Sequence, residues 1–448
     1  MPQDIKDIKV SVYIDNQDVH DAERLKELQS LSLSEKIAIT QARIIEWFNF
    51  WEGNVFVSFS GGKDSTVLLD LVRKTIAAIN PTFEVPVVFS NTGLEYPEIQ
   101  AFARKQGATF VTPKMNFVKV IREYGYPLIG KEVANAIYYA RRIRPYNNAA
   151  AGCSERERER ERGFKETIFK RLDFEERRPA NRQMLCSPPT QQFLTTDRKR
   201  AELSDKRYDS SSKSTYQAGE YKATCASWEL GNDNCTAKSK FNKKKWLPLV
   251  YTPFLISGKC CDVMKKSPMG IYQRATHNKP FLGTMADESL MRRQSWIRTG
   301  CNAFEGKKPS SQPLSFWSEQ DILNYIKTNN LEICSVYGDI VENGTWLETT
   351  GCKRTGCVFC AFGVYLEKGE TRFQALARTH PKQYKFAIEG GEWIDNPYYD
   401  PNAPEYDGEW KNWNPKKLWT SNNHGLGMGY VFDMVNEIYG ENFMRYKI

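Results

Sequence analysis

A glycine pair between an apolar run and an amphipathic stretch is the first feature of this sequence that could do chemistry. Glycine lets a backbone approach a phosphate closely, and a helix start offers free N–H groups and a positive dipole end. Serine hydroxyls add donors, and a lysine adds a mobile positive charge suited to pyrophosphate. The spacing is not that of a Walker A loop, and plain turn chemistry would leave the charged residues and serines without a role. We therefore expect a nucleotide-binding loop made of Ser60, Gly61, Gly62, Lys63, Asp64 and Ser65.

Two pairs of cysteines form a second candidate site. A CxxC turn can hold a metal centre from one side, whereas an adjacent pair needs an unusual local backbone, so both pairs would be required. Lys265 and Lys266, which follow the adjacent pair, would lower the electrostatic cost of thiolate charge. The donor set fits zinc as well as an iron–sulfur cluster, and reduced core thiols are a further alternative. The candidate ligands are Cys260, Cys261, Cys357 and Cys360.

The chain contains 11 cysteines among 448 residues. It has no run of 18 apolar residues and no signal-peptide pattern at its start, so we expect a cytoplasmic protein without a membrane segment. In that compartment cysteines are more often metal ligands or reactive thiols than disulfides. Cys352 could replace a ligand or accept sulfur, and Cys301 and Cys334 are expected to be buried packing residues. Four further thiols have no assigned role: Cys153, Cys186, Cys225 and Cys235.

Alternating strand and helix patterns must position these residues. An amphipathic helix is predicted over 34–51, with Ser34 as its N-cap, and another over 132–143. The elements between them are predicted at 54–59, 64–77, 85–90, 96–106, 109–112 and 116–124. This order indicates an α/β fold with a doubly wound, mostly parallel sheet. Ligands of such sheets lie beyond the carboxyl ends of the strands, where the loops at Ser60 and Asn91 would both emerge.

Charge and patterning divide the chain further. The net charge is +9, with Lys and Arg recurring through residues 141–245. A solvated surface is the favoured interpretation of this charge, and a nucleic-acid contact is the alternative. The predicted parts are an N-terminal extension (1–31), the first part of a nucleotide-binding core (32–143), a charged insertion (144–245), a core continuation with the cysteines (246–365), and a helical and aromatic cover (366–448).

Several segments also carry a family resemblance. Residues 60–65 resemble the SGGxDS loop of the PP-loop adenine-nucleotide α-hydrolase superfamily. Residues 87–98 are similar to the second strand and "DTG…PE" loop of the phosphoadenylyl-sulfate (PAPS) reductase family, with Asn91 in place of Asp. Residues 283–293 resemble its "GxRxxES…R" segment, with Met285 in place of Arg, and residues 313–322 resemble its "PLxxWtxxDV" helix start.

The resemblance implies roles for further residues. In the second loop it implies nucleotide contacts from Asn91, Thr92, Gly93 and Glu98. Arg292 and Arg293 carry forked donors suited to phosphate or sulfate, with surface ion pairing as the alternative. The CC…CxxC arrangement is similar to the ligands of the 4Fe–4S cluster in assimilatory adenylyl-sulfate reductases.

Two reactions follow from the resemblance. Sulfonucleotide reductases use a cysteine near the C-terminus, but Cys360 is the last cysteine here. The complete loop 60–65 instead points to the ATP pyrophosphatase branch, where ATP yields AMP and pyrophosphate and sulfur replaces the adenylate on an acceptor. Lys63 and the loop amides would stabilise pyrophosphate, with Mg²⁺ held partly by Asp64, and Arg292 and Arg293 would assist.

The leading hypothesis is therefore nucleic-acid sulfur modification, as in the DNA phosphorothioation component that resembles PAPS reductase. It includes a sulfur or electron donor protein as partner. The alternatives are reduction of PAPS or adenylyl sulfate to sulfite, and a non-catalytic nucleotide-sensing subunit.

Overall fold

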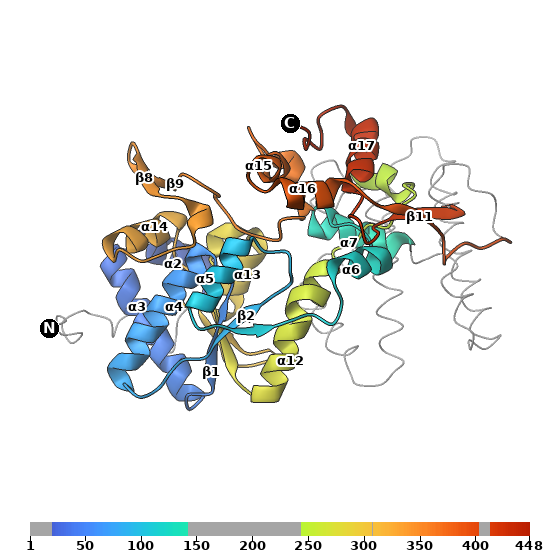
Figure 1. The fold of residues 1–448 in the computed structure, drawn as a ribbon. Helices are drawn as coiled ribbons and strands as arrows, with labels where there is room; N and C mark the ends of the chain where they lie inside the picture. Colours follow the sequence, from blue (N-terminus) through green and yellow to red (C-terminus); the bar gives the residue numbers. More distant parts are fainter. Residues whose placement is uncertain (1–19, 142–242, 307, 403–412) are drawn as a thin grey trace, which may run out of the picture. The chain divides into compact units, whose positions relative to one another are not determined.

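The computed structural model describes residues 20–141, 243–306, 308–402 and 413–448 (Figure 1). Its contacts divide the chain into two compact units. The first comprises the described residues up to Phe117 together with Cys260–Cys360, and the second the described residues of Val118–Lys259 and of Ala361–Ile448. Most of the predicted insertion, with Cys153, Cys186, Cys225 and Cys235, lies outside the described residues.

The first unit is built on a six-stranded sheet of order β3-β2-β1-β5-β7-β6. Neighbouring strands are parallel from β3 to β7, and only β6 runs antiparallel to β7. This confirms the predicted α/β fold with a mostly parallel sheet. Its strands are β1 (Val55–Phe59), β2 (Val87–Ser90), β3 (Thr109–Val111), β5 (Lys279–Leu282), β6 (Asn302–Ala303) and β7 (Ser310–Ser311).

Helices cover both faces of this sheet because side chains alternate along β1. Phe56 packs against Tyr272 of α12 (Ser267–Thr276) with ring centroids 5.1 Å apart. Phe59 points to the other face and packs against Phe102 of α5 (Pro97–Lys105) at 6.1 Å. Figure 1 shows α4 and α12 on opposite sides of the strands. The remaining helices of this unit are α2 (Ala22–Ser30), α3 (Leu33–Phe50), α4 (Lys63–Ile79), α13 (Leu290–Thr299) and α14 (Glu319–Thr328), and a hairpin is formed by β8 (Ile340–Asn343) and β9 (Trp346–Thr349).

The strand order places a topological switch beside β1. From β1 the chain builds outward to β2 and β3, and it later returns on the other side of β1 as β5. The loops after β1 and β5 leave the same edge of the sheet, and such crevices bind ligands in open α/β folds. A Cβ built on Gly283 would lie 3.1 Å from the Cα of Ser65, so the two loops are in close contact.

Two helix starts differ from the prediction. Helix α3 is capped by Ser32, whose side chain accepts from the N–H of Glu35 while the Glu35 carboxylate accepts from the N–H of Ser32. This reciprocal capping box makes the prediction of Ser34 as N-cap wrong. The predicted N-terminal extension also contains helix α2, capped by the side chain of Asp21.

In the second unit one arginine holds the segment 249–254 in place. The guanidinium of Arg141, at the end of α7, donates to the carbonyl oxygens of Leu249, Val250, Thr252 and Phe254 at 2.7–3.0 Å. Arg141 was predicted as part of the basic surface, but these four bonds give it a structural role.

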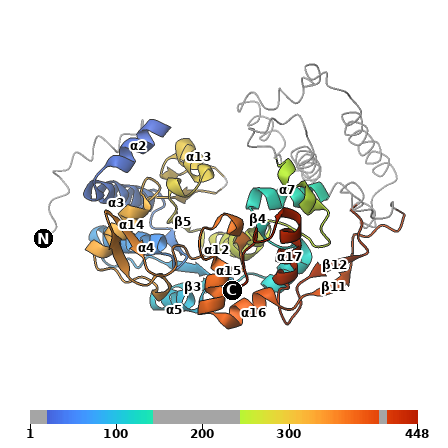
Figure 2. The same ribbon diagram turned by 90° about the horizontal axis from the view of Figure 1, so that it is seen from above.

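Figure 2 shows the β11–β12 hairpin and the helices α15, α16 and α17 of the second unit. Its elements are α6 (Phe117–Tyr124), β4 (Leu128–Ile129), α7 (Lys131–Arg141), β10 (Ala361–Phe362), α15 (Arg372–Thr379), α16 (Pro381–Ile388), β11 (Glu392–Asp395), β12 (Lys417–Thr420) and α17 (Met428–Tyr439). Within the described parts of the chain, no helix is both long enough and apolar enough to span a membrane.

Candidate functional site

The loop 60–65 is a rigid turn between β1 and α4. The hydroxyls of Ser60 and Ser65 lie 3.0 Å apart, Ser65 Oγ donates to the carbonyl of Gly62 at 2.9 Å, and the N–H of Gly62 donates to Ser60 Oγ. Gly61 has φ +72°, and a Cβ there would lie 2.7 Å from Ile99 Cγ2. Glycine is therefore required at this position for both its backbone angle and its lack of a side chain.

Lys63, the first residue of α4, is only 4% exposed. Its ammonium forms an ion pair with Glu319 and donates to the carbonyl of Lys353 at 2.8 Å. Its backbone N–H donates to Tyr337 Oη at 3.3 Å. The lysine is thus held at the helix start by α14 and by the segment that precedes Cys357.

Asp64 has a buried carboxylate oxygen, Oδ1, for which the described residues provide no hydrogen-bond partner. Burial raises the pKa of this carboxyl, an effect that Lys63, Arg354 and Arg292 oppose. A buried carboxylate oxygen without a donor favours a bound cation, and carboxylate oxygens are the ligands that Mg²⁺ prefers. The site therefore fits the predicted magnesium ion.

Only one of the two predicted arginines lies at this carboxyl. Arg292 forms an ion pair with Glu288, and its pKa is lowered by burial and by the nearby guanidinium of Arg354. Among the described charges that shift the pKa of Asp64, Arg292 and Arg354 are present and Arg293 is not. Arg354 was not predicted from the sequence, because it belongs to no phosphate-binding motif and lies between Cys352 and Cys357, which were interpreted as possible metal ligands.

The second predicted loop is stabilised by its own side chains. Asn91 Oδ1 accepts from the N–H of Gly93 at 3.3 Å, and the hydroxyl and N–H of Thr92 donate to the Glu95 carboxylate at 2.6 and 3.1 Å. The carbonyl of Leu94 accepts from the N–H of Val358 at 2.8 Å, so this loop contacts the cysteine-bearing segment.

Glu98 lies in the first turn of α5 and acts on the pKa of Cys334. Of the charged residues in this loop, Glu95 was not singled out from the sequence, yet it is the one that interacts with Cys357.

The two predicted cysteine pairs interact with each other. Cys260 shares a hydrogen bond with Cys261, which together with burial raises the pKa of its thiol, and the thiols of Cys360 and Cys357 raise it further. The residues directly after the adjacent pair, Asp262–Lys266, form a π-helical turn before α12. Such turns are rare and often mark functional sites. Cys261 itself has ordinary helical angles, φ −64° and ψ −35°, so the unusual backbone predicted for the adjacent pair begins only after it.

Lys265 compensates charge at this cluster. Burial lowers the pKa of its ammonium, but Cys357, Glu95 and Cys261 raise it, and the net direction is upward. Burial also raises the pKa of Cys357 to about 11, against the effect of Lys265. Lys266, which was expected to act in the same way, forms an ion pair with Asp262 at 2.9 Å instead.

Zinc and a 4Fe–4S cluster place different geometric demands on the four predicted cysteine ligands. Within the described residues, no group of three or more His, Cys, Asp or Glu side chains is arranged to hold a metal ion. A single zinc ion needs four ligands in one tight tetrahedron, whereas a cluster binds each thiolate through a different iron and spaces them more widely. The donor chemistry, four thiols beside the Lys265 ammonium, is of the kind used by both metal centres, so the cluster and its zinc alternative remain predictions for these residues.

Three further cysteines lie in the described residues, Cys301, Cys334 and Cys352. Cys301 and Cys334 are buried, as predicted, and Cys301 Sγ lies 3.3 Å from Ser315 Oγ. Cys352 is half-buried, and its N–H donates to the carbonyl of Val336 at 2.8 Å.

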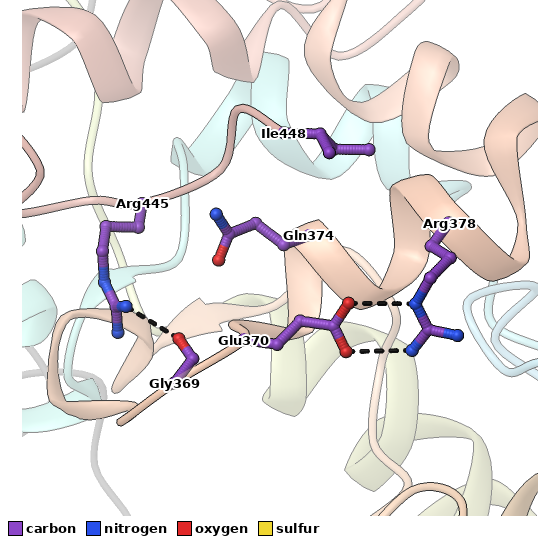
Figure 3. A pocket seen from close by; sticks show the side chains of 6 residues that line it. All are labelled: Gly369, Glu370, Gln374, Arg378, Arg445 and Ile448. Atoms are coloured by element: carbon purple, nitrogen blue, oxygen red, sulfur yellow. Dashed lines mark hydrogen bonds and ion pairs between the residues drawn. The ribbon is translucent and has the colours of Figure 1, made fainter.

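A pocket of about 420 Å³ lies in the second unit, and none of the predicted site residues lines it (Figure 3). Arg378 donates two hydrogen bonds to the Glu370 carboxylate, at 2.9 and 3.0 Å, and Arg445 donates to the carbonyl of Gly369 at 2.7 Å. The two arginines of this pocket therefore hold its own loop and helix together.

The glycine turn, the buried lysine and the sheet switch define a PP-loop nucleotide-binding protein. The family model of the phosphoadenosine phosphosulfate reductase domain matches residues 54–124 and 192–362, more than half of the chain. The chain therefore belongs to the PAPS reductase family of the PP-loop superfamily, a family that binds adenine nucleotides. A comparison with curated proteins gave no match.

Proposed function

We propose that this protein binds ATP with Mg²⁺ and cleaves it to AMP and pyrophosphate in order to activate an acceptor for sulfur transfer. The observation that carries the proposal is the buried Asp64 oxygen without a donor, adjacent to Lys63 at the start of α4. A magnesium triphosphate supplies the counter-ion that this carboxylate needs. Reduction of a sulfonucleotide, the alternative reaction, releases sulfite and no pyrophosphate.

The residues of the chain would act by placing positive charge and hydrogen-bond donors around the phosphates of ATP. Lys63 and the N–H groups at the start of α4 would hold the β- and γ-phosphates, where negative charge grows as pyrophosphate leaves. Arg292, in the segment after β5, would bind the same oxygens through its forked donors. Mg²⁺, held by Asp64, would neutralise phosphate charge. We propose Ser60, Gly61, Gly62 and Ser65 as the backbone and hydroxyl contacts of the phosphates.

We further propose that Cys260, Cys261, Cys357 and Cys360 hold a 4Fe–4S cluster. Burial and the neighbouring thiols raise the pKa of Cys260 and of Cys357, so both thiols stay protonated without a cation, and metal binding would displace those protons. A cluster would supply a centre that stores electrons or carries sulfur for the acceptor. We also propose a cytoplasmic location, where reducing conditions keep thiols available as metal ligands.

The proposed acceptor of the sulfur atom is a nucleic acid. The resemblance to the DNA phosphorothioation component favours nucleic acid as the acceptor, and the recurring Lys and Arg of residues 141–245 are compatible with that partner. A sulfur or electron donor protein would then complete the reaction. Asn91, Thr92, Gly93 and Glu98 remain proposed contacts of the nucleoside part, and Arg293 a proposed contact of the acceptor side.

The test is product analysis under anaerobic conditions. The full chain, purified without oxygen, is incubated with ATP, Mg²⁺ and either single- or double-stranded DNA. AMP and pyrophosphate in equal amounts support the proposal. Release of sulfite from PAPS, with ATP left intact, would assign the chain to the reductases instead.

A further inference from the structure

The segment between Cys352 and Cys357 carries a cation for which the proposed function has no role. Arg354 is exposed, and within the described residues it forms no ion pair. Both of its neighbours are anchored at the phosphate loop. The Lys353 carbonyl accepts from the Lys63 ammonium at 2.8 Å, and Thr355 Oγ1 lies 2.6 Å from Tyr337 Oη, which itself accepts from the Lys63 N–H. The backbone of Arg354 is therefore fixed beside the start of α4.

The same two anchoring side chains, Tyr337 and Thr355, also lie against the phosphate loop at Gly62. A Cβ on Gly62 would lie 3.3 Å from Tyr337 Oη and 3.7 Å from Thr355 Oγ1. Tyr337 and Thr355 thus cover Gly62 from the side of the cysteine-bearing segment. Arg354, between two anchored residues, can reach the same space by rotation of its long side chain.

The charge distribution favours an anion at this place. Arg354 acts electrostatically on both Asp64 and Arg292. Arg292 is ion-paired with Glu288 and Lys63 with Glu319, whereas Arg354 interacts with Asp64 only electrostatically and forms no ion pair with a described carboxylate. Two neighbouring guanidiniums repel each other unless an anion lies between them, and phosphate oxygens match their forked donors.

We propose that Arg354 is a phosphate-binding residue and that segment 352–360 forms a third wall of the nucleotide site, beside loops 60–65 and 283–289. The inference rests on the proposed function for the identity of the ligand, a nucleotide with at least two linked phosphates. It adds that the segment bearing Cys357 and Cys360 contacts this nucleotide directly.

Binding of two probes tests the inference. ATP with Mg²⁺ and inorganic pyrophosphate are titrated separately into the anaerobically purified full chain, as the wild type and as R354A, R354K and R378A. R378A is the matched control, because it also removes an exposed arginine, one that pairs with Glu370 at 2.9 Å and has no proposed part in nucleotide binding. Loss of a charge-assisted contact predicts an affinity about 10- to 100-fold weaker for both probes in R354A. R354K should lie between R354A and the wild type, since lysine keeps the charge but not the fork, and R378A should bind like the wild type.

The results distinguish the phosphate-binding role of Arg354 from the proposed function, ATP cleavage. If the wild type binds both probes and R354A binds them equally well, Arg354 is not a phosphate ligand, while the proposed function stands. If the wild type binds pyrophosphate through Arg354 but does not bind ATP, the inference stands and the proposed function fails. Binding of neither probe overturns both. Thermal unfolding of each variant shows whether it is folded.

Discussion

Lys63 donates a hydrogen bond from its ammonium to the backbone carbonyl of Lys353 at 2.8 Å. These residues come from the start of α4 and from the segment between β9 and the CxxC pair, far apart in the sequence. The bond joins loop 60–65 directly to the segment that carries Cys357 and Cys360, two of the four proposed cluster ligands. A substitution in the phosphate loop should therefore alter the segment that bears Cys357, and a substitution in that segment should alter nucleotide binding.

Replacing Lys63 by methionine should reduce ATP cleavage by about 100-fold or more, because one preorganised donor to developing charge is commonly worth that much. Lys74 lies on the same helix and pairs with Asp70 at the surface, so K74M is a control that removes one charge from α4. Initial rates of pyrophosphate release compare the variants. Equal rates in K63M and K74M would exclude Lys63 from catalysis.

Replacing Asp64 by asparagine should separate stability from activity. Burial disfavours the charged carboxyl, so D64N should unfold at the same temperature as the wild type or higher, yet lose ATP cleavage. Mg²⁺ with ATP should raise the melting temperature of the wild type and not that of D64N. An equal rise in both proteins would show that Asp64 does not hold the cation.

Replacing Gly61 by alanine tests the rigidity of the loop. The new Cβ would meet Ile99 Cγ2 at 2.7 Å and carry a φ of +72°, and together these should cost about 1–3 kcal/mol of unfolding free energy. Gly107 has the same φ with open space around it, so G107A measures the backbone cost alone. Denaturant unfolding of both variants gives the difference. A smaller cost in G61A than in G107A would contradict the described packing.

Replacing Cys357 by serine should remove iron and inorganic sulfide from the anaerobically purified protein. Because Lys353 and Thr355 lie just before this residue, ATP affinity should also fall by a few-fold. C301S is the control, since Cys301 is buried against Ser315 away from the cluster. Metal and sulfide analysis is the measurement. Zinc without sulfide in the wild type would replace the cluster by a structural zinc site.

The tyrosines predict how stability responds to alkali. Burial raises the pKa of Tyr337 and Tyr446 to about 12, whereas an unfolded tyrosine ionises near pH 10. Below pH 10 both states are neutral and the two pKa values have no effect. As pH rises from about 10 toward 12 the unfolded state loses protons first, so stability falls. Denaturant melts between pH 8 and 11.5 should be flat and then decline, and Y337F should decline less.

The sheet and the phosphate loop could be predicted because their signals are local. The β-branched run at Val55, the glycines at 61 and 62 and the helical period after Lys63 occupy adjacent residues, and the structure places them within one or two residues of the prediction. The cap of α3 could also have been found, since Ser32 with Glu35 three residues later is a capping-box pattern.

The partners of the loop could not be predicted in the same way. Glu319, Tyr337 and Arg354 meet Lys63 and Asp64 only because the chain returns to the PP loop after β7, and no local pattern marks that contact. Glu95 likewise becomes part of the cysteine cluster through Lys265 and Cys357. The spacing of residues in the sequence identifies side chains with suitable chemistry. Only the three-dimensional structure shows which of these side chains lie in the same site.

The most direct test of the central claim is the fate of ATP in the anaerobic full chain with Mg²⁺. We predict that AMP and pyrophosphate appear together, with no ADP or free phosphate, and that K63M abolishes both while K74M does not. ATP that stays intact in the presence of every acceptor, or that is cleaved at the same rate by K63M, would contradict the account.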